Sequence, residues 1–249
     1  MKLLSLEKGL QIIEQLSEQP QGLSLLELNQ KLGFPKSTIH HVLSTFLPYN
    51  YVIQDPDTRK YSIGFKFLSI GRAFLDNIDL RKISAKHLRK LFEECNEPVH
   101  LYILRGGQLV CIDKLETPGR LSLATYVGFS TDPHAAAAGK VLLCGLPPDK
   151  IVETYKGRKL KKYGKNTITR LSELMKELEK VRKQGYAVDD EEYYEGVRCV
   201  AAPVRAGGQI VAAISITGST IRMSMERIRQ ELKNRVMATA ERISSELKW

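Results

Sequence analysis

Residues 23–47 read LSLLELNQKLGFPKSTIHHVLSTFL, and this stretch decides how the N-terminal part of the chain folds. Ser24 and Glu27 have the S-x-x-E spacing of a capping box, in which two residues satisfy backbone N–H groups at the start of a helix. Gly33 stands where a helix usually ends, and Pro35 suits the first turn of the next helix because its missing N–H is not needed there. The pattern predicts two short helices joined by a tight turn.

The second of these helices has two different faces. Its apolar residues recur at the spacing of a buried stripe and are Ile39, Val42, Leu43 and Phe46. The polar residues expected to face outward are Lys36, Ser37, Thr38, His40, His41 and Ser44. A short helix, a glycine turn and a second helix with a compact polar face are typical of a helix-turn-helix that reads the major groove of DNA. The alternative is an ordinary helical hairpin with a solvated outer face.

Elements on both sides extend this motif. Residues 5–18 have the spacing of an earlier helix with Ser5 as its cap. The residues of that helix expected to face inward are Leu6, Leu10, Ile13 and Leu16. Two β-prone runs, 51–53 and 61–63, flank the sequence Asp-Pro-Asp-Thr and predict a β-hairpin with Arg59 and Lys60 near its tip. Three helices and such a hairpin form a winged helix-turn-helix. In that motif Arg59, Lys60 and Ser24 are expected to hold the DNA backbone while the second helix reads base edges.

Charge gives only weak support for DNA binding. The chain has 249 residues and a formal net charge of +10, which favours an anionic partner. Residues 1–75, however, contain eight Lys and Arg against six Asp and Glu. Residues 156–183 contain eleven basic residues against three acids, and a solvated surface is their expected role, with contact to DNA or another subunit as the alternative. A winged module that contacts protein instead of DNA is therefore a rival interpretation.

Composition excludes several other classes of protein. The four cysteines, Cys95, Cys111, Cys144 and Cys199, have no C-x-x-C spacing, so neither a zinc site nor a disulfide framework is predicted, and no cofactor is expected. No run approaches the roughly 18 apolar residues of a membrane span. The first residues lack the apolar core of a signal peptide. A cytoplasmic protein without metal or membrane contact is expected.

Residues 65–79 form another amphipathic pattern. Its apolar residues are Phe67, Ile70, Phe74 and Leu75. Such a stripe suits a helix that links domains or pairs two subunits. Packing on the winged domain itself is an equal alternative.

From residue 80 onward, strands lie between helices. The expected helices cover residues 80–95, a segment opened by Asp132-Pro133-His134, 169–184 and 222–249. The expected strands cover residues 99–104, 108–115, a segment near 121–127, 186–190, 197–204 and 209–217. Strands flanked by helices at both ends predict an α+β domain with an antiparallel sheet.

Three C-terminal segments resemble the IclR family of bacterial transcriptional regulators. They read VGFSTDPHAAAAGKVLLCGLP, QGYAVDDEEYYEGVRCVAAPV and QIVAAISITG. The N-terminal segments GLSLLELNQKLGFPKSTIHHVLSTF and DPDTRKYSIG resemble the winged domain of this family. The resemblance implies a winged helix-turn-helix domain at residues 1–64, a linker or dimerisation helix at 65–79 and a GAF-like effector-binding domain at 80–249.

The resemblance also implies what the protein binds. Regulators of this kind are homodimers or dimers of dimers that bind a palindromic double-stranded operator. A small metabolite, often an organic or sugar acid, changes their affinity for DNA. Repression is the expected sign of control, and no enzymatic activity is expected.

The effector pocket of the family maps by motif onto this chain. The matching positions are Val127, Gly128, Phe129, Asp189, Cys199, Ser215 and Thr217. Ser215 and Thr217 lie two apart on one predicted strand, so both hydroxyls share a face. Hydroxyls, N–H groups of the Gly128 loop and a helix N-terminus suit a carboxylate ligand, whereas Asp189 suits a hydroxyl or a hydrated carbonyl.

Several positions depart from the family pattern. His41 stands where an arginine is common, which removes an expected phosphate or base contact. Pro48-Tyr49-Asn50 replaces the usual acidic-Gly turn before the wing. Asn50 tolerates the left-handed conformation that glycine would adopt, so the turn is expected to survive. Thr217 replaces a frequent serine and keeps the hydroxyl.

An enzyme is the remaining alternative. It would use Cys199 as a nucleophile with His134 and Asp189, since residues distant in sequence can meet in a fold. Nothing in the sequence marks the Cys199 thiol as activated. Cys199 as a small core residue and His134 as a local hydrogen-bonding group are the ordinary interpretations.

Overall fold

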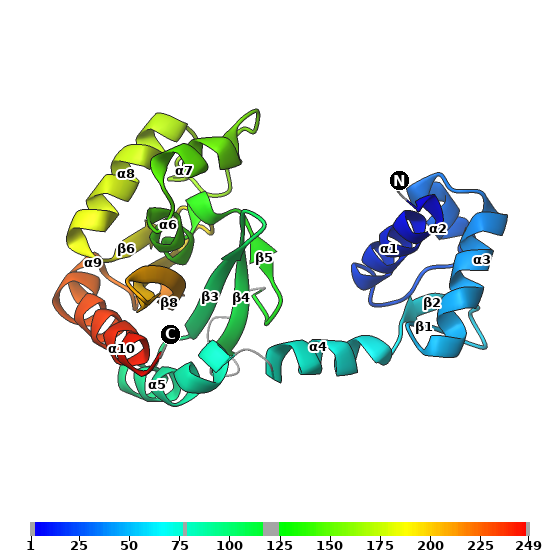
Figure 1. Cartoon of the computed structure of the whole chain (residues 1–249), viewed down its shortest axis with the longest axis horizontal. Helices are drawn as coiled ribbons and strands as arrows, with labels where there is room; N and C mark the ends of the chain where they lie inside the picture. Colours follow the sequence, from blue (N-terminus) through cyan, green and yellow to red (C-terminus); the bar gives the residue numbers. More distant parts are fainter. Residues whose placement is uncertain (1–2, 77–78, 117–124, 248–249) are drawn as a thin grey trace. The chain divides into compact units, whose positions relative to one another are not determined.

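The computed structural model describes residues 3–76, 79–116 and 125–247. The chain divides into two compact units, Met1–Asn77 and Ile78–Trp249 (Figure 1). Each unit has its own hydrophobic core. The fold prediction of a winged helix-turn-helix followed by an α+β domain is confirmed.

The first unit is built on three helices, α1 (Leu4–Ser17), α2 (Leu25–Leu32) and α3 (Lys36–Phe46). The predicted capping box is present at α2: the Ser24 hydroxyl accepts from the Glu27 N–H at 3.2 Å, and the Glu27 carboxylate accepts from the Ser24 N–H at 2.7 Å. Gly33 ends α2 in the left-handed conformation with φ 69°. The core between the helices contains Ile12, Leu16, Leu28, Ile39 and Leu43.

The predicted inward face of α1 is wrong in part. Leu6 and Leu10 are 59% and 57% exposed, whereas Gly9, Ile12 and Leu16 face the core. The reason lies at Gly9: a Cβ there would lie 3.1 Å from the Phe46 ring, so the missing side chain lets α3 approach this face of α1. Ser5 is not the cap either, because α1 begins at Leu4 without a side-chain cap.

The wing is a short hairpin of β1 (Val52–Gln54) and β2 (Tyr61–Ile63). Its turn is fixed by the Asp55 carboxylate, which accepts from the backbone N–H groups of Asp57 and Thr58 at 3.1 and 2.7 Å. A 3-10 turn, Leu47–Tyr49, precedes the wing and ends at Asn50 with φ 58° and ψ 22°. The expectation that Asn50 would adopt the left-handed conformation is confirmed.

Helix α4 (Lys66–Asp76) follows the wing and begins on it. The Phe67 ring lies edge-on to Tyr51 at 5.2 Å between centroids, and the Lys66 N–H donates to the Asn50 carbonyl at 3.1 Å. Its apolar residues Leu68, Ile70 and Phe74 are exposed, as is Phe65 just before the helix. The first turn of α4 thus packs on its own unit and leaves an apolar stripe uncovered within the unit.

The second unit contains a six-stranded antiparallel sheet in the order β5-β4-β3-β8-β7-β6. Its strands are β3 (Val99–Arg105), β4 (Gln108–Leu115), β5 (Ser130–Thr131), β6 (Ala187–Asp190), β7 (Val197–Ala206) and β8 (Gln209–Ser219). The antiparallel arrangement and the glycine-turned hairpins agree with the sequence prediction.

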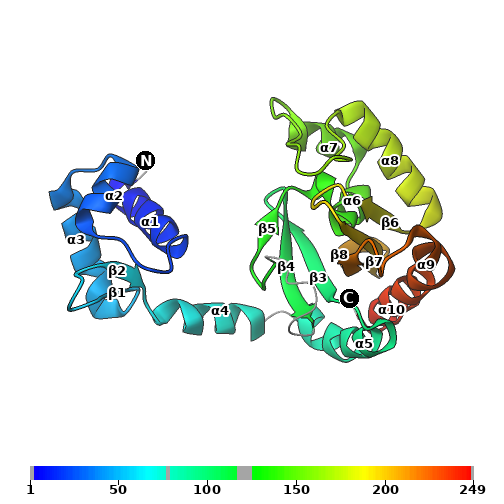
Figure 2. The same cartoon turned by 180° about the vertical axis from the view of Figure 1, so that it is seen from behind.

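Helices cover both faces of this sheet (Figure 2). One face packs on α5 (Asp79–Cys95) and α10 (Lys233–Glu246) through residues such as Val200, Ile214 and Val236. The other face packs on α6 (Ala137–Cys144) through Ala201 and Ala213. Helices α7 (Pro148–Tyr155) and α8 (Leu171–Gln184) surround the outer side of α6.

Three predicted boundaries in this unit need correction. Of the strand expected near 121–127, residues 121–124 lie outside the described residues, and the described remainder is not a strand. The helix expected from residue 132 begins at Ala137, after a separate 3-10 turn, Pro133–Ala135. The last helix begins at α9 (Met225–Arg227), where Ser224 is the cap, and continues through a π-helical turn, Ile228–Leu232, into α10.

Glycine at position 139 is required by the close packing of α6 on this 3-10 turn. A Cβ on Gly139 would lie 2.0 Å from the Pro133 carbonyl oxygen. We predict that Gly139→Ala destabilises the second unit by about 1–3 kcal/mol or more, as overpacking does, in urea unfolding. Gly71→Ala is the control: a Cβ there meets nothing within 4 Å, so this helical position should gain stability. Equal unfolding midpoints for Gly139→Ala and the wild type would refute this account.

Candidate nucleic-acid interface and ligand site

The polar face predicted for the second helix of the motif is the outer face of α3. Burial of Ile39 and Leu43 fixes the rotation of this helix. The predicted DNA-contacting residues Lys36, Ser37, His40, His41 and Ser44 are exposed, and Thr38 is half-buried. The helix therefore presents hydroxyl, imidazole and ammonium groups together, and these groups can hydrogen-bond to base edges and phosphates.

The wing adds two cations, of which one is paired with an acid. Arg59 is exposed, adopts the left-handed conformation with φ 58° and has no ion pair among the described residues. The Lys60 ammonium instead lies 3.6 Å from the Glu27 carboxylate. The hydrogen bond from the Ser24 backbone N–H, with smaller effects from the Ser24 hydroxyl and Lys60, lowers the pKa of Glu27. Lys60 thus ties the wing to the start of α2, and Arg59 is the better candidate for a phosphate contact.

The predicted ligand residues of the sheet form a row across three strands. Asp189 on β6 pairs with Cys199 on β7, and Cys199 pairs with Thr217 on β8. The Thr217 hydroxyl donates to the Cys199 sulfur at 3.3 Å. Ser215 lies two residues along β8 from Thr217, opposite Ala201. Directly paired residues share a face, so these four side chains lie on the side of the sheet that α6 covers.

Asp189 is buried, at 3% exposed, and its carboxylate accepts from the Glu192 backbone N–H at 2.7 Å. Burial, and then the charge of Glu192, raises the pKa of Asp189 to about 7. The carboxyl group can therefore act as a hydrogen-bond donor or acceptor near neutral pH.

A buried lysine, which the sequence patterns did not single out, supports Asp189. Lys140 on α6 is 1% exposed, and its ammonium donates to the Val188 carbonyl at 2.6 Å and to the Glu192 carboxylate. The Glu177 carboxylate lies 3.9 Å away. A lysine inside the apolar run AAAAGKVLL was the available signal, because a charge in such a run must find a buried partner.

The loop at residues 127–129 does not offer the donors expected of it. The Gly128 N–H donates to the Cys111 carbonyl at 2.8 Å, and the Phe129 N–H donates to the Tyr126 carbonyl at 2.9 Å. Phe129 also packs against the apolar cluster below α6, while Val127 is exposed. The expectation that these N–H groups would bind a carboxylate is therefore wrong for Gly128 and Phe129.

The residues of the enzyme alternative are not arranged for nucleophilic catalysis. Burial, and then the charge of Asp189, raises the pKa of the Cys199 thiol well above its ordinary value, so the reactive thiolate is disfavoured. His134 Nε2 lies 2.9 Å from the Lys161 carbonyl oxygen, and burial lowers the pKa of this imidazole. The hydrogen bond of His134 therefore goes to a loop carbonyl, whereas Cys199 receives its hydrogen bond from Thr217.

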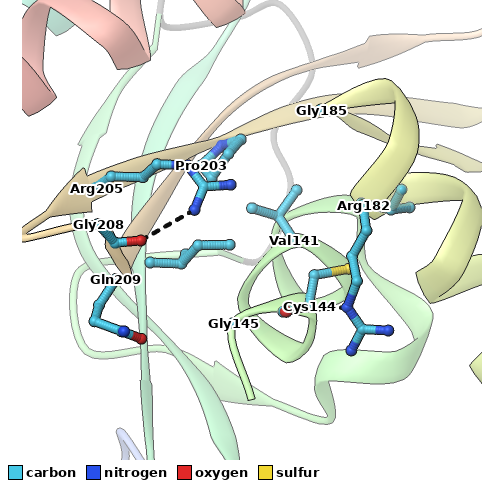
Figure 3. Close-up of a pocket in the computed structure, with 11 residues that line it drawn as sticks. Val141, Cys144, Gly145, Arg182, Gly185, Pro203, Arg205, Gly208 and Gln209 are labelled. Carbon is cyan, nitrogen blue, oxygen red and sulfur yellow. Dashed lines mark hydrogen bonds between the residues drawn. The ribbon is translucent and has the colours of Figure 1, made fainter. Parts of the chain in front are cut away.

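A cavity of about 290 Å³ lies at the C-terminal end of α6 (Figure 3). It contains two guanidinium groups: Arg182 donates to the Cys144 and Leu146 carbonyls at 3.3 and 3.4 Å, and Arg205 donates to the Gly208 carbonyl at 3.4 Å. Arg182 thus satisfies carbonyls at the last residue of α6 and just after it, as cations near helix C-termini do. None of the predicted ligand residues lines this cavity.

The described residues contain neither a metal-binding group nor a membrane-spanning helix. Within them, no group of His, Cys, Asp and Glu side chains could hold a metal ion. None of their helices is both long enough and apolar enough to span a membrane.

A winged helix-turn-helix that is followed in the chain by an α+β unit with a polar sheet face defines a DNA-binding regulator with a sensory domain. Comparison with family models agrees: a model of the bacterial transcriptional regulator IclR C-terminal region matches residues 72–245, and one of the IclR helix-turn-helix domain matches residues 5–56. The chain belongs to the IclR family. It is a helix-turn-helix transcriptional regulator with a C-terminal effector-binding domain.

Individual relatives match over nearly the whole chain. The HTH-type transcriptional regulator KdgR of Escherichia coli is 32% identical, and the match covers 95% of this chain and 89% of that protein. The crystal structure of Thermotoga maritima IclR is 30% identical with a TM-score of 0.81 and full coverage of both chains, 100% and 100%. A homologue from Microbacterium hydrocarbonoxydans complexed with 4-hydroxybenzoate shares the fold at 18% identity, with a TM-score of 0.84 over 97% of this chain and 98% of that chain.

Titration of Asp189 should make stability depend on pH. Because its pKa is raised from 3.8 to about 7, the folded state favours the protonated form. This contribution is fully present below 3.8 and is lost as the pH rises through about 7. We predict that wild-type protein loses free energy of unfolding relative to Asp189→Asn as urea titrations move from acid pH to above pH 7. Asp190→Asn, on the same strand but the other face, is the control, and a difference that does not change with pH would contradict the prediction.

Proposed function

We propose that this regulator is a cytoplasmic repressor that binds a palindromic operator as a homodimer or a dimer of dimers. A small carboxylic acid, bound in the second unit, changes its affinity for that operator. The observation that carries the proposal is that the chain has both an exposed polar recognition helix, in the first unit, and a buried polar sheet face, in the second. The names of two relatives agree with this sign of control, since the AllR proteins of Klebsiella pneumoniae and Escherichia coli are described as transcriptional repressors.

Contacts with DNA would divide between α3 and the wing. The side chains proposed to enter the major groove are Lys36, Ser37, Thr38, His40, His41 and Ser44. Arg59, with Ser24 and Lys60 beside it, would hold the phosphate backbone. Because Lys60 is already paired with Glu27, Arg59 carries most of this role. The small charge of the winged unit predicts a modest salt dependence per subunit.

Pairing of subunits would supply the affinity that one winged unit lacks. Two half-sites engaged together act at a high effective concentration. The proposed contact between subunits is made by exposed apolar residues of α4, with Leu68 and Phe74 among them, and by Phe65 just before the helix. Effector binding then needs to favour one arrangement of the two winged units, and a coupling of about 1–3 kcal/mol changes operator affinity by about 5- to 150-fold.

The effector site would be the polar row on the sheet. Its proposed residues are Asp189, Cys199, Ser215 and Thr217 on the sheet. The loop residues Val127, Gly128 and Phe129 would border the site without donating the N–H groups of Gly128 and Phe129, which are already bonded within the chain. The hydroxyls of Ser215 and Thr217 and the carboxyl group of Asp189 are uncharged or partly protonated near pH 7. These groups suit an acid that also carries hydroxyl or carbonyl groups. The same chemistry would suit a ligand such as 4-hydroxybenzoate, which the Microbacterium homologue holds in its crystal structure.

The test is footprinting on the DNA upstream of its own gene. Wild-type protein should protect a palindrome there, and Lys36→Glu should abolish the protection because it places a negative charge at the start of α3. Arg59→Ala should weaken binding and reduce the salt slope by about 0.9 for each phosphate that is no longer neutralised. Lys176→Glu, in the basic stretch 156–183, is the matched control and should bind normally.

Other outcomes would favour the alternatives. Absence of a protected palindrome with wild-type protein, or duplex binding with a salt slope near zero, would favour a winged module for protein contact. For the enzyme alternative the decisive variant is Cys199→Ser. If this variant binds the operator normally and loses only its response to ligand, Cys199 acts in sensing and the enzyme alternative fails.

A further inference from the structure

His100 is a buried polar side chain on the effector face, in addition to the residues of the proposed site. It lies on β3, directly opposite Ser215 on β8 and Lys114 on β4. The residue is 0% exposed, and its ring stacks on Tyr102 with 5.7 Å between centroids. Because His100 and Ser215 are paired, their side chains point to the same face.

The two nitrogens of this ring differ in their surroundings among the described residues. Nε2 lies 3.3 Å from the Thr125 hydroxyl, whereas Nδ1 is buried without a hydrogen bond among the described residues. Burial, and then the charge of Lys114, lowers the pKa of His100 to about 3, so the imidazole is neutral at physiological pH. A neutral imidazole offers one donor and one acceptor, and buried polar groups in folded proteins nearly always have a partner.

His100 and Ser215 mark one end of the polar face, and Asp189 and Thr217 mark the other. The paired residues of the first row are Ala201, Ser215 and His100, and those of the second row are Asp189, Cys199 and Thr217. The rows are two residues apart along the strands, so they are separated by about 6–7 Å. Ser215 and Thr217, on the same strand, have this spacing, whereas Asp189 lies two strands from Thr217 and three from His100. A ligand that contacts both Ser215 and Thr217 must place its polar groups about 6–7 Å apart.

The two nearby lysines are already neutralised. The Lys140 ammonium is bonded to Glu192, and the Lys114 ammonium lies 2.6 Å from the Glu116 carboxylate and donates to the Thr125 carbonyl. The site therefore offers neutral donors at the His100 row and a carboxyl group at the Asp189 row. A second negative charge near Asp189 would be repelled, so an anionic group of the ligand fits the His100 row.

We propose that His100 and Ser215 hold the carboxylate of the effector, while Thr217 holds a hydroxyl about 6–7 Å from Ser215 along the same strand. The effector is then a small hydroxylated monocarboxylic acid whose hydroxyl is several bonds from its carboxyl group. This inference rests on the proposed effector site and specifies its ligand. His100 is a binding residue, and its unpartnered Nδ1 is the atom that contacts the ligand.

A first test needs no ligand. In His100→Phe the aromatic ring remains on Tyr102, and a buried nitrogen without a partner is removed. The melting temperature of the ligand-free full chain should therefore stay the same or rise. A clear fall would show that the imidazole is needed for folding itself and would overturn the role proposed for Nδ1. If His100→Phe fails to fold while His100→Asn folds, a polar group at this position is needed for folding, and the role proposed for Nδ1 is again overturned.

The second test measures ligand class by calorimetry on the full chain. The probes are 5-hydroxypentanoate, which spans the two rows when extended, pentanoate, which lacks the hydroxyl, and 1,5-pentanediol, which lacks the carboxylate. Glycolate, whose hydroxyl adjoins the carboxylate, tests the spacing. We expect 5-hydroxypentanoate to bind about 10- to 100-fold more tightly than each of the others, as the loss of one well-placed hydrogen bond to a charged or buried group predicts.

The variants separate the two ends of the site. His100→Phe should weaken 5-hydroxypentanoate about tenfold or more, and Thr217→Val should remove its advantage over pentanoate. Ser84→Ala removes a buried hydroxyl on α5 that also has no hydrogen-bond partner among the described residues, and it should change nothing. Equal binding of the acid and its deoxy analogue, normal binding by His100→Phe, or no binding of any probe by a chain that still protects its operator would each overturn the ligand class. In that last case the proposed DNA-binding function would stand, because footprinting measures it separately.

Discussion

The second unit depends on the bonds that the buried Lys140 ammonium makes inside it. A charge inside a protein must be paired, and removal of one partner is costly because the other charge is left alone. The Val188 carbonyl and the Glu192 carboxylate pair it, and both belong to the segment that contains Asp189. The Glu192 N–H in turn holds the Asp189 carboxyl group. One lysine on α6 thus sets the position of the edge strand and of the acid that faces the ligand.

Much of the fold was predictable because it depends on short-range chemistry. The capping box of Ser24 and Glu27, the left-handed Gly33 and Asn50, and the glycine-turned hairpins are set by residues within a few positions of one another. The inward face of α1 was not predictable from the sequence, because it depends on how closely α3 approaches Gly9. A stripe of leucines at helical spacing shows that a helix is amphipathic, and the neighbouring helix decides which residues it covers.

The site was predictable in part, and for a similar reason. The residues mapped onto β6, β7 and β8 do lie together, because antiparallel pairing aligns Asp189, Cys199 and Thr217. Lys140 and His100 were missed, since their partners are far away in sequence and each residue type is usually solvated or structural. The loop at Gly128 looked like a donor of N–H groups, and only the structure shows that the backbone of β4 and of the loop itself uses them.

Ligand binding in the second unit is proposed to control DNA binding by the first. The direct measurement is the operator affinity of the full chain by fluorescence anisotropy, with and without a saturating acid that raises its melting temperature. We expect a change of about 5- to 150-fold in wild-type protein. At the same acid concentration, the change should be much smaller in Thr217→Val and His100→Phe, which bind the acid more weakly. An acid that binds tightly and leaves the operator affinity of wild-type protein unchanged would contradict the proposal.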